Sequence, residues 1–248
     1  MRYFLKLAYN GTKYFGWQTQ PNHITVQEVL DGALLKLLNK PVYTLGCGRT
    51  DTGVHAKKFF AHVDIEEDLP DEFHFKLNCV LPKDIVILEI IPVEKERHAR
   101  FDAISRTYQY FLHFKKDPFL EPGSFCYPFH VLDFEKIIEA TELLLSYQDF
   151  KPLCRYNQDR YKHTRCNLTE ARWEEISETG QMKFTITANR FLRSMVRRIV
   201  GAMVLIGRGK MTIGELKKVM DDVSEFKIKI AVPPQGLYLV DVQYPYIS

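Results

Sequence analysis

An antiparallel β-hairpin decides the fold, and it occupies residues 164–188, which read TRCNLTEARWEEI-SETG-QMKFTITA. Both arms are rich in β-branched and aromatic residues, which favour strands. The four residues between them, Ser177–Gly180, are of the kind that forms turns. Strands joined by so short a connection pair antiparallel. The hairpin therefore predicts a largely antiparallel sheet.

Further strands and helices are expected on both sides of this hairpin. The order of these elements predicts the α+β class, with two similar mixed α/β lobes, residues 1–103 and 104–248, sharing a central, largely antiparallel sheet. Alternation of side-chain type predicts strands over residues 2–9, 42–45, 59–65, 85–92, 106–114 and 236–242. Helices are expected over residues 71–78, 133–145 and 190–206, and two more begin at the capping pairs Thr25 with Glu28 and Thr212 with Glu215.

Composition limits the class of protein. The chain has 248 residues, 46% of them hydrophobic, and a formal net charge of +3, which is too small to identify a nucleic-acid binder by itself. Five cysteines without a C-x-x-C pair argue against a disulfide framework. The beginning of the chain lacks the apolar core of a signal peptide, and the longest apolar stretch, Ile199–Ile206, is too short to span a bilayer. A cytoplasmic protein is expected.

Cysteine and histidine also raise the question of a metal site. Cys154, His163 and Cys166 are near one another in the sequence and carry ligand atoms. No fourth ligand stands at a spacing typical of zinc sites. The sequence therefore predicts no metal site.

Residues 46–55, GCGRTDTGVH, carry the strongest candidate for chemistry. Glycines bracket Arg49 and Asp51 after a predicted strand, and glycine permits a tight loop that presents a side chain to a cleft. Arg49 is suited to binding a phosphate or to orienting the carboxylate. The alternative is a glycine-rich turn in which Asp51 only caps a helix. The segment is not a phosphate-binding P-loop, because its G-x-x-x-x-G-K-[ST] pattern is absent.

Two other segments combine positive charge with aromatic or apolar residues. Arg106, Tyr108 and Tyr110 fall on one face of a predicted strand, a combination suited to phosphate contact and base stacking. Arg193 and Arg197, together with Arg190, fall along one side of the predicted helix and form a candidate phosphate-binding stripe. The alternatives are an ordinary half-buried strand and a solvated helix face.

At these residues the chain resembles the tRNA pseudouridine synthase A family, and the resemblance extends almost from end to end. Single motifs of this kind are weak, but so many in the right order are specific. They read Tyr9-Asn10-Gly11-Thr12, Gly16-Trp17-Gln18, Thr25-Val26-Gln27, Gly48-Arg49-Thr50-Asp51, Leu77-Asn78 with Leu81-Pro82, His98-Ala99-Arg100-Phe101, Arg106-x-Tyr108-x-Tyr110, Phe191-Leu192 with Met195-Val196-Arg197, and Pro234-Gln235-Gly236-Leu237-Tyr238-Leu239.

The resemblance implies a two-lobed α+β fold with a basic active-site cleft between the lobes. It implies a homodimer without metal or cofactor that converts uridine to pseudouridine at positions 38, 39 and 40 of the tRNA anticodon stem-loop. Asp51 corresponds to the catalytic aspartate of the family, Tyr108 to its active-site tyrosine, Arg197 to the basic partner of the aspartate, and Leu237 to an apolar contact of the base. Asn10, Lys58-Phe59 and residues 149–153 depart from the family pattern.

Two other functions remain to be weighed. One is a non-catalytic RNA-binding protein of the same fold, against which the complete set Asp51, Tyr108 and Arg197 argues. The other is a phosphotransferase with Asp51 as nucleophile, which normally needs further carboxylates to hold Mg²⁺. For the isomerase, the sequence leaves open whether Asp51 attacks C1′ or removes a proton from C2′.

Overall fold

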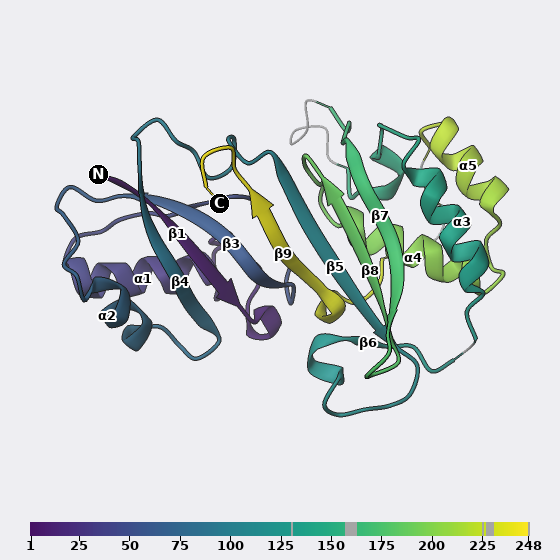
Figure 1. The fold of residues 1–248 in the computed structure, drawn as a ribbon, viewed down its shortest axis with the longest axis horizontal. Helices are drawn as coiled ribbons and strands as arrows, with labels where there is room; N and C mark the ends of the chain where they lie inside the picture. The colour runs from purple at the N-terminus through teal and green to yellow at the C-terminus, as the bar shows by residue number, and fades with distance from the viewer. Residues whose placement is uncertain (130, 157–162, 225, 227–230, 248) are drawn as a thin grey trace. The chain divides into compact units, whose positions relative to one another are not determined.

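The computed structural model describes residues 1–129, 131–156, 163–224, 226 and 231–247. The chain divides into two compact units (Figure 1). Unit 1 comprises Met1–Ile104 and Tyr238–Ser248, and unit 2 comprises Ser105–Leu237. The sequence predicts a boundary after residue 103, with all later residues in one lobe. In the structure, the last strand returns to the first unit.

Unit 1 is a mainly antiparallel sheet in which β1 lies between β3 and β4. Strand β9 pairs parallel with β3 on the other side, with His55 opposite Tyr238. The helices α1 and α2 lie together against these strands (Figure 1). The elements are β1 (Arg2–Tyr9), η1 (Gly11–Lys13), α1 (Val26–Leu38), β2 (Leu45–Gly46), β3 (His55–Asp64), α2 (Phe73–Val80), β4 (Ile85–Val93) and β9 (Leu237–Gln243).

The core of unit 1 is aromatic. Phe4 and Phe60 are completely buried, and both meet the ring of Tyr244 edge-on with centroids 5.3 and 5.0 Å away. This geometry suits the positive edge and negative face of aromatic rings. The hydroxyl of Tyr244 donates a hydrogen bond to the carbonyl of Ala99, so the C-terminal residues are tied into unit 1. These contacts explain why the chain returns to its first unit.

Unit 2 contains the hairpin predicted from residues 164–188. Strand β8 lies between β5 and β7, both antiparallel to it, and Trp173 faces Phe184 across the hairpin. Gly180 closes the turn with a φ of 64°, a left-handed conformation that favours glycine. The elements are β5 (Ser105–His113), η2 (Glu121–Gly123), β6 (Phe125–Cys126), α3 (Phe134–Leu144), η3 (Lys151–Leu153), β7 (Leu168–Ile176), β8 (Gln181–Ala188), α4 (Met195–Gly207), α5 (Ile213–Asp221) and η5 (Pro234–Gly236).

The helix expected over residues 190–206 begins later than predicted. Helix α4 starts at Met195, and Ser194 before it has a left-handed backbone with a φ of 57°. Arg190 and Arg193 therefore lie in the segment before the helix, and the predicted stripe of three arginines on one helix face is wrong. Of these three residues, only Arg197 belongs to α4.

The side chains predicted to cap α1 and α5 accept backbone hydrogen bonds, and the complete capping box is formed at α5. The side chain of Thr25 accepts a hydrogen bond from the backbone N–H of Glu28 at the start of α1. Thr212 and Glu215 form a complete capping box at the start of α5. With strands and helices in both units, the α+β class is confirmed.

A half-buried carboxylate on α1, Asp31, predicts how stability depends on pH. Asp31 Oδ1 accepts hydrogen bonds from Thr44 N at 3.0 Å and Thr44 Oγ1 at 2.7 Å. Burial nevertheless raises the pKa of Asp31 from 3.8 to about 6, and the two hydrogen bonds only partly oppose it. Between these two values the folded protein keeps a proton that the unfolded chain has lost. The contribution of Asp31 to the free energy of unfolding should therefore fall as pH rises from about 4 to about 6.

Asp31→Asn should remove this contribution, because the amide oxygen can still accept from Thr44 and no charge forms. Urea unfolding across this pH range is the measurement, and we expect a smaller loss of stability with rising pH in Asp31→Asn than in the wild type. Asp68→Asn, which changes an exposed carboxylate of unit 1, is the control and should keep the wild-type slope. A wild-type slope in Asp31→Asn would contradict the assignment.

Candidate active site

The segment with Asp51 forms a tight loop between two paired strands. Gly46 in β2 lies opposite Ala61 in β3, and the backbone N–H of Cys47 donates to the carbonyl of Phe60 at 2.7 Å. The chain then turns through Asp51, whose carbonyl accepts from the N–H of Val54 at 3.1 Å. It enters β3 directly afterwards. The structure therefore excludes the alternative in which Asp51 caps a helix, because a strand follows the loop.

Buried anchors stand on both sides of Asp51. Thr50 is 9% exposed, and its hydroxyl is 2.9 Å from the hydroxyl of Tyr9. Val54 is 1% exposed. Between these anchors Asp51 is half-buried and Arg49 is exposed, so both charged side chains remain within reach of solvent. The loop thus holds a carboxylate and a guanidinium two residues apart on a fixed backbone.

The residues around η1 hold the loop from the other side. Gly16 has a φ of 85°, and a Cβ atom placed on it would lie 2.2 Å from the carbonyl oxygen of Thr50. A Cβ on Gly11 would lie 1.9 Å from the carbonyl oxygen of Val54. Only glycine permits this approach of two backbones. The glycines of the Tyr9–Gln18 motifs therefore shape the Asp51 loop, a role that their sequence pattern does not indicate.

A buried histidine fixes the end of the loop. His55 Nδ1 accepts a hydrogen bond from the N–H of Gly11 at 3.1 Å, so the ring proton is on Nε2 when the imidazole is neutral. The ring stacks on Tyr238, with centroids 4.5 Å apart and planes at 20°. His55 and Tyr238 were not among the predicted site residues. Their pairing comes from the parallel contact of β3 with β9, which no local pattern reveals.

Asn10 departs from the family pattern, and its structural role is clear. Its Oδ1 accepts hydrogen bonds from Thr12 N at 3.1 Å and Thr12 Oγ1 at 2.6 Å, which caps η1. Asparagine and aspartate both cap through a side-chain oxygen. The substitution therefore keeps the cap.

Unit 2 supplies the predicted aromatic and basic residues. Tyr108 lies in the middle of β5 opposite Ile186, is half-buried, and meets the ring of Phe191 edge-on at 5.0 Å. Arg106 donates from Nη1 to the carbonyl of Asn189 at 2.8 Å. Tyr110, expected on the same exposed face, is instead completely buried and donates its hydroxyl to the carbonyl of Pro233. Tyr110 is therefore a core residue of unit 2.

Arg197 in the first turn of α4 links to the segment that leads into β9. Its Nε donates to the carbonyl of Val232 at 2.7 Å, and its own carbonyl accepts from the N–H of Val232 at 3.1 Å. Leu237 follows five residues later, directly after η5, and is 6% exposed. Arg193 is exposed, and its carbonyl accepts from the N–H of Arg155 at 2.9 Å.

The predicted site residues thus belong to both units. Asp51 and Arg49 share one loop of unit 1. Unit 2 contains the other predicted site residues, which are Tyr108, Arg106, Arg193, Arg197 and Leu237. In the part of the chain that the structure describes, none of the helices has the length and apolar character of a membrane span.

Comparison with known proteins gives the family. Residues 140–245 match the family model described as tRNA pseudouridine synthase. A tRNA pseudouridine synthase A of Porphyromonas gingivalis is 45% identical over 98% of this chain and 97% of its own length. The corresponding protein of Parabacteroides distasonis is also 45% identical, over 98% and 96%, and that of Caldicellulosiruptor bescii is 35% identical, over 97% and 98%. With such identity over nearly the whole length, this chain belongs to the tRNA pseudouridine synthase A family.

Proposed function

We propose that this protein isomerises uridine to pseudouridine at positions 38, 39 and 40 of the tRNA anticodon stem-loop, with Asp51 as its catalytic carboxylate. The observation that carries the proposal is the Asp51 loop, which fixes a half-buried carboxylate between the buried anchors Thr50 and Val54. Membership of the family supports the reaction and its tRNA substrate.

The reaction rearranges bonds within one nucleotide. The N1–C1′ bond breaks, the uracil turns, a C5–C1′ bond forms, C5 loses its proton and N1 gains one, so the composition of the nucleotide is unchanged. Asp51 either attacks C1′ or removes a proton from C2′ on the way to a glycal, which is then protonated again. Either role needs an ionised carboxylate, and we assign Arg197 as its basic partner. An opposite charge favours the ionised form.

The other residues are assigned to binding the uridine and its phosphates. A uridine in a stem must leave the base stack, which costs a few kcal/mol, and contacts in the binding pocket offset this cost. Tyr108 is assigned to stacking on the uracil and to helping to remove the C5 proton, with Phe191 holding its ring edge-on. Leu237 is assigned to the other face of the base. Arg49, Arg106 and Arg193 are assigned to the RNA backbone, where positive side chains dominate affinity.

The phosphotransferase alternative lacks its ligand set. Among the described residues, the one group of three or more possible metal ligands is His113, Glu121 and Cys126, and Asp51 is not part of it. We therefore expect turnover to continue in excess EDTA. A requirement for Mg²⁺ would favour phosphoryl transfer instead.

The test of the proposed function is pseudouridine formation in unmodified tRNA after incubation with the purified protein. Chemical detection of pseudouridine separates the isomerase from an RNA-binding protein that has lost the reaction. Tight binding of tRNA without any pseudouridine would favour the non-catalytic alternative. Two further expectations, a homodimer and a cytoplasmic location, can be checked by ultracentrifugation and by cell fractionation.

Arg193→Ala should weaken tRNA binding and reduce its salt dependence. Each phosphate contact that is lost lowers the slope of log affinity against log salt concentration by about 1. The measurement is a salt titration of the dissociation constant. The matched control is Arg172→Ala, which also removes one positive charge from unit 2, but one that pairs with Glu170 and Glu174. The same slope in Arg193→Ala and the wild type would remove Arg193 from the RNA-binding surface.

A further inference from the structure

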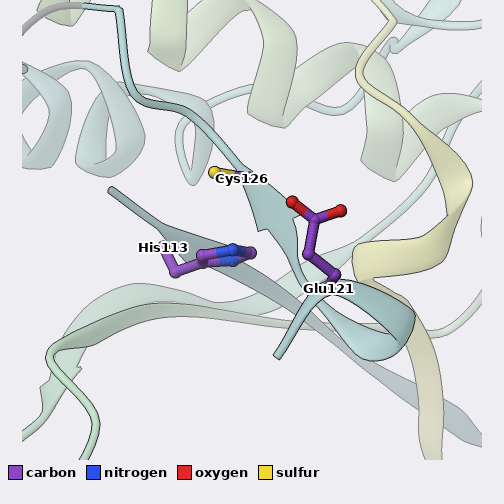
Figure 2. Close-up of side chains that lie close together, drawn as sticks. All are labelled: His113, Glu121 and Cys126. Carbon is purple, nitrogen blue, oxygen red and sulfur yellow. The ribbon is translucent and has the colours of Figure 1, made fainter. Parts of the chain in front are cut away.

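Three side chains with metal-binding atoms meet in unit 2, and none of them is assigned to the uridine. They are His113 at the end of β5, Glu121 in η2 and Cys126 in β6, hereafter the 113/121/126 cluster. Their ligand atoms all lie within 4.8 Å of one another. Figure 2 shows the imidazole, the carboxylate and the thiol facing a common space.

The backbone brings these three residues together. Strand β6 pairs parallel with β5, so that Cys126 lies directly opposite His113. The N–H of Tyr127 donates to the carbonyl of His113 at 2.7 Å, which continues the pairing past Cys126. Glu121 enters through the short helix η2, where the N–H of Gly123 donates to the carbonyl of Leu120. The strand pairing therefore fixes His113 and Cys126 next to each other.

The histidine shows a feature that itself points to a ligand. His113 is 2% exposed, and its Nδ1 is 3.0 Å from the hydroxyl of Ser124, which is 1% exposed. Its Nε2 is buried and has no hydrogen-bond partner among the described residues. A buried polar atom without a partner is costly and rare, so it calls for an explanation. If Nδ1–H donates to Ser124, Nε2 carries the lone pair, as in histidines that bind metal through one nitrogen and donate from the other.

The donor atoms select the kind of ion. Imidazole nitrogen, thiolate sulfur and carboxylate oxygen are the three ligand types of zinc, and three protein ligands leave a fourth position for water. In a tetrahedral zinc site the ligand atoms lie about 3.3–3.8 Å from one another. Small rotations of the Glu121 and Cys126 side chains would bring their ligand atoms to this separation. Glu121 is exposed and Cys126 half-buried, which gives an ion a path from solvent.

We propose that the 113/121/126 cluster binds a divalent transition-metal ion, with zinc as the preferred ion. The ion would bind His113 Nε2, Glu121 and the Cys126 thiolate, and the thiol proton would be released to solvent. It would tie η2 and β6 to the end of β5. None of its three ligands is assigned to the isomerisation.

Cobalt is the probe that tests this site. Co²⁺ substitutes for Zn²⁺ and gives a thiolate-to-metal charge-transfer band only when a cysteine binds it. We expect the metal-free, untagged wild-type protein to bind one Co²⁺ per chain with this band, and to lose the band when Zn²⁺ is added. Cys126→Ser should lose the band, and Glu121→Gln should bind Co²⁺ on the order of tenfold or more weakly.

The control is Cys79→Ser, which removes an exposed thiol from α2 in unit 1 and should leave the band unchanged. Circular dichroism of each metal-free variant checks its fold, and Glu121→Gln changes an exposed residue, so it tests the site without disturbing the core. No band in the wild type, or an equal loss in Cys79→Ser, would overturn the proposal. Pseudouridine formation by the metal-free protein is scored separately, so failure of the metal site leaves the proposed function intact.

Discussion

Asp51→Asn is expected to lower the rate of pseudouridine formation by at least about 10³-fold, because the amide can neither attack C1′ nor remove a proton from C2′. Asparagine has nearly the same size and shape, and the anchors Thr50 and Val54 do not involve the changed atoms. The loop should therefore keep its conformation. The measurement is release of tritium from tRNA labelled at C5 of uridine, since C5 loses its hydrogen in the reaction.

Binding of tRNA should survive in the same variant. The change removes a negative charge, and negative charge does not attract a phosphate backbone. Asp68→Asn, an exposed carboxylate of the same unit, serves as the matched control and should keep wild-type turnover. If Asp51→Asn releases tritium at the wild-type rate, another group performs the chemistry.

Gly16→Ala is expected to lower the free energy of unfolding strongly. A left-handed backbone costs an L-residue about 1–2 kcal/mol, and here the added Cβ would also lie 2.2 Å from the carbonyl oxygen of Thr50. Because the atom that the added Cβ would meet belongs to the backbone and not to a flexible side chain, the Asp51 loop itself must move. We expect a loss of more than about 2 kcal/mol in the free energy of unfolding, together with reduced turnover. Urea denaturation and tritium release measure the two effects.

Variants of two other glycines separate the cost of the left-handed backbone from the cost of the contact with Thr50. Gly180 shares the left-handed backbone, with a φ of 64°, but has open space where a Cβ would stand, so Gly180→Ala should cost about 1 kcal/mol and leave turnover unchanged. Gly48 lies in the Asp51 loop and also has open space, so Gly48→Ala should change stability by less than about 0.5 kcal/mol. Equal stability losses in Gly16→Ala and Gly180→Ala would show that contact with Thr50 is unimportant.

Local features of the fold were predictable from the sequence. The alternation of side-chain types predicted β1 with its observed bounds, and the turn residues predicted the position of the hairpin formed by β7 and β8. The start of α4 was not predictable, because helical periodicity continues through residues 190–194 and the left-handed Ser194 interrupts it. The burial of Tyr110 was also missed. Its position depends on the carbonyl of Pro233, which is far away in the sequence.

The candidate site also has a part that was predictable from the sequence and a part that was not. Its glycine-rich segment stood out because glycine, arginine and aspartate are unusual neighbours in a strand-to-strand connection. The contacts that fix this loop come from Gly11 and Gly16, more than thirty residues earlier, and only tertiary structure shows them. The 113/121/126 cluster was missed for a similar reason. It depends on a parallel pairing between β5 and the two-residue strand β6, which has no signal in the sequence.

The most direct test of the account is a nucleotide-resolution map of pseudouridine in an unmodified tRNA that carries uridine at positions 38, 39 and 40. Wild-type protein and Asp51→Asn are incubated with it in parallel. We expect pseudouridine at these three positions with the wild type and none with the variant. Pseudouridine outside the anticodon stem-loop only, or the same map with both proteins, would contradict it.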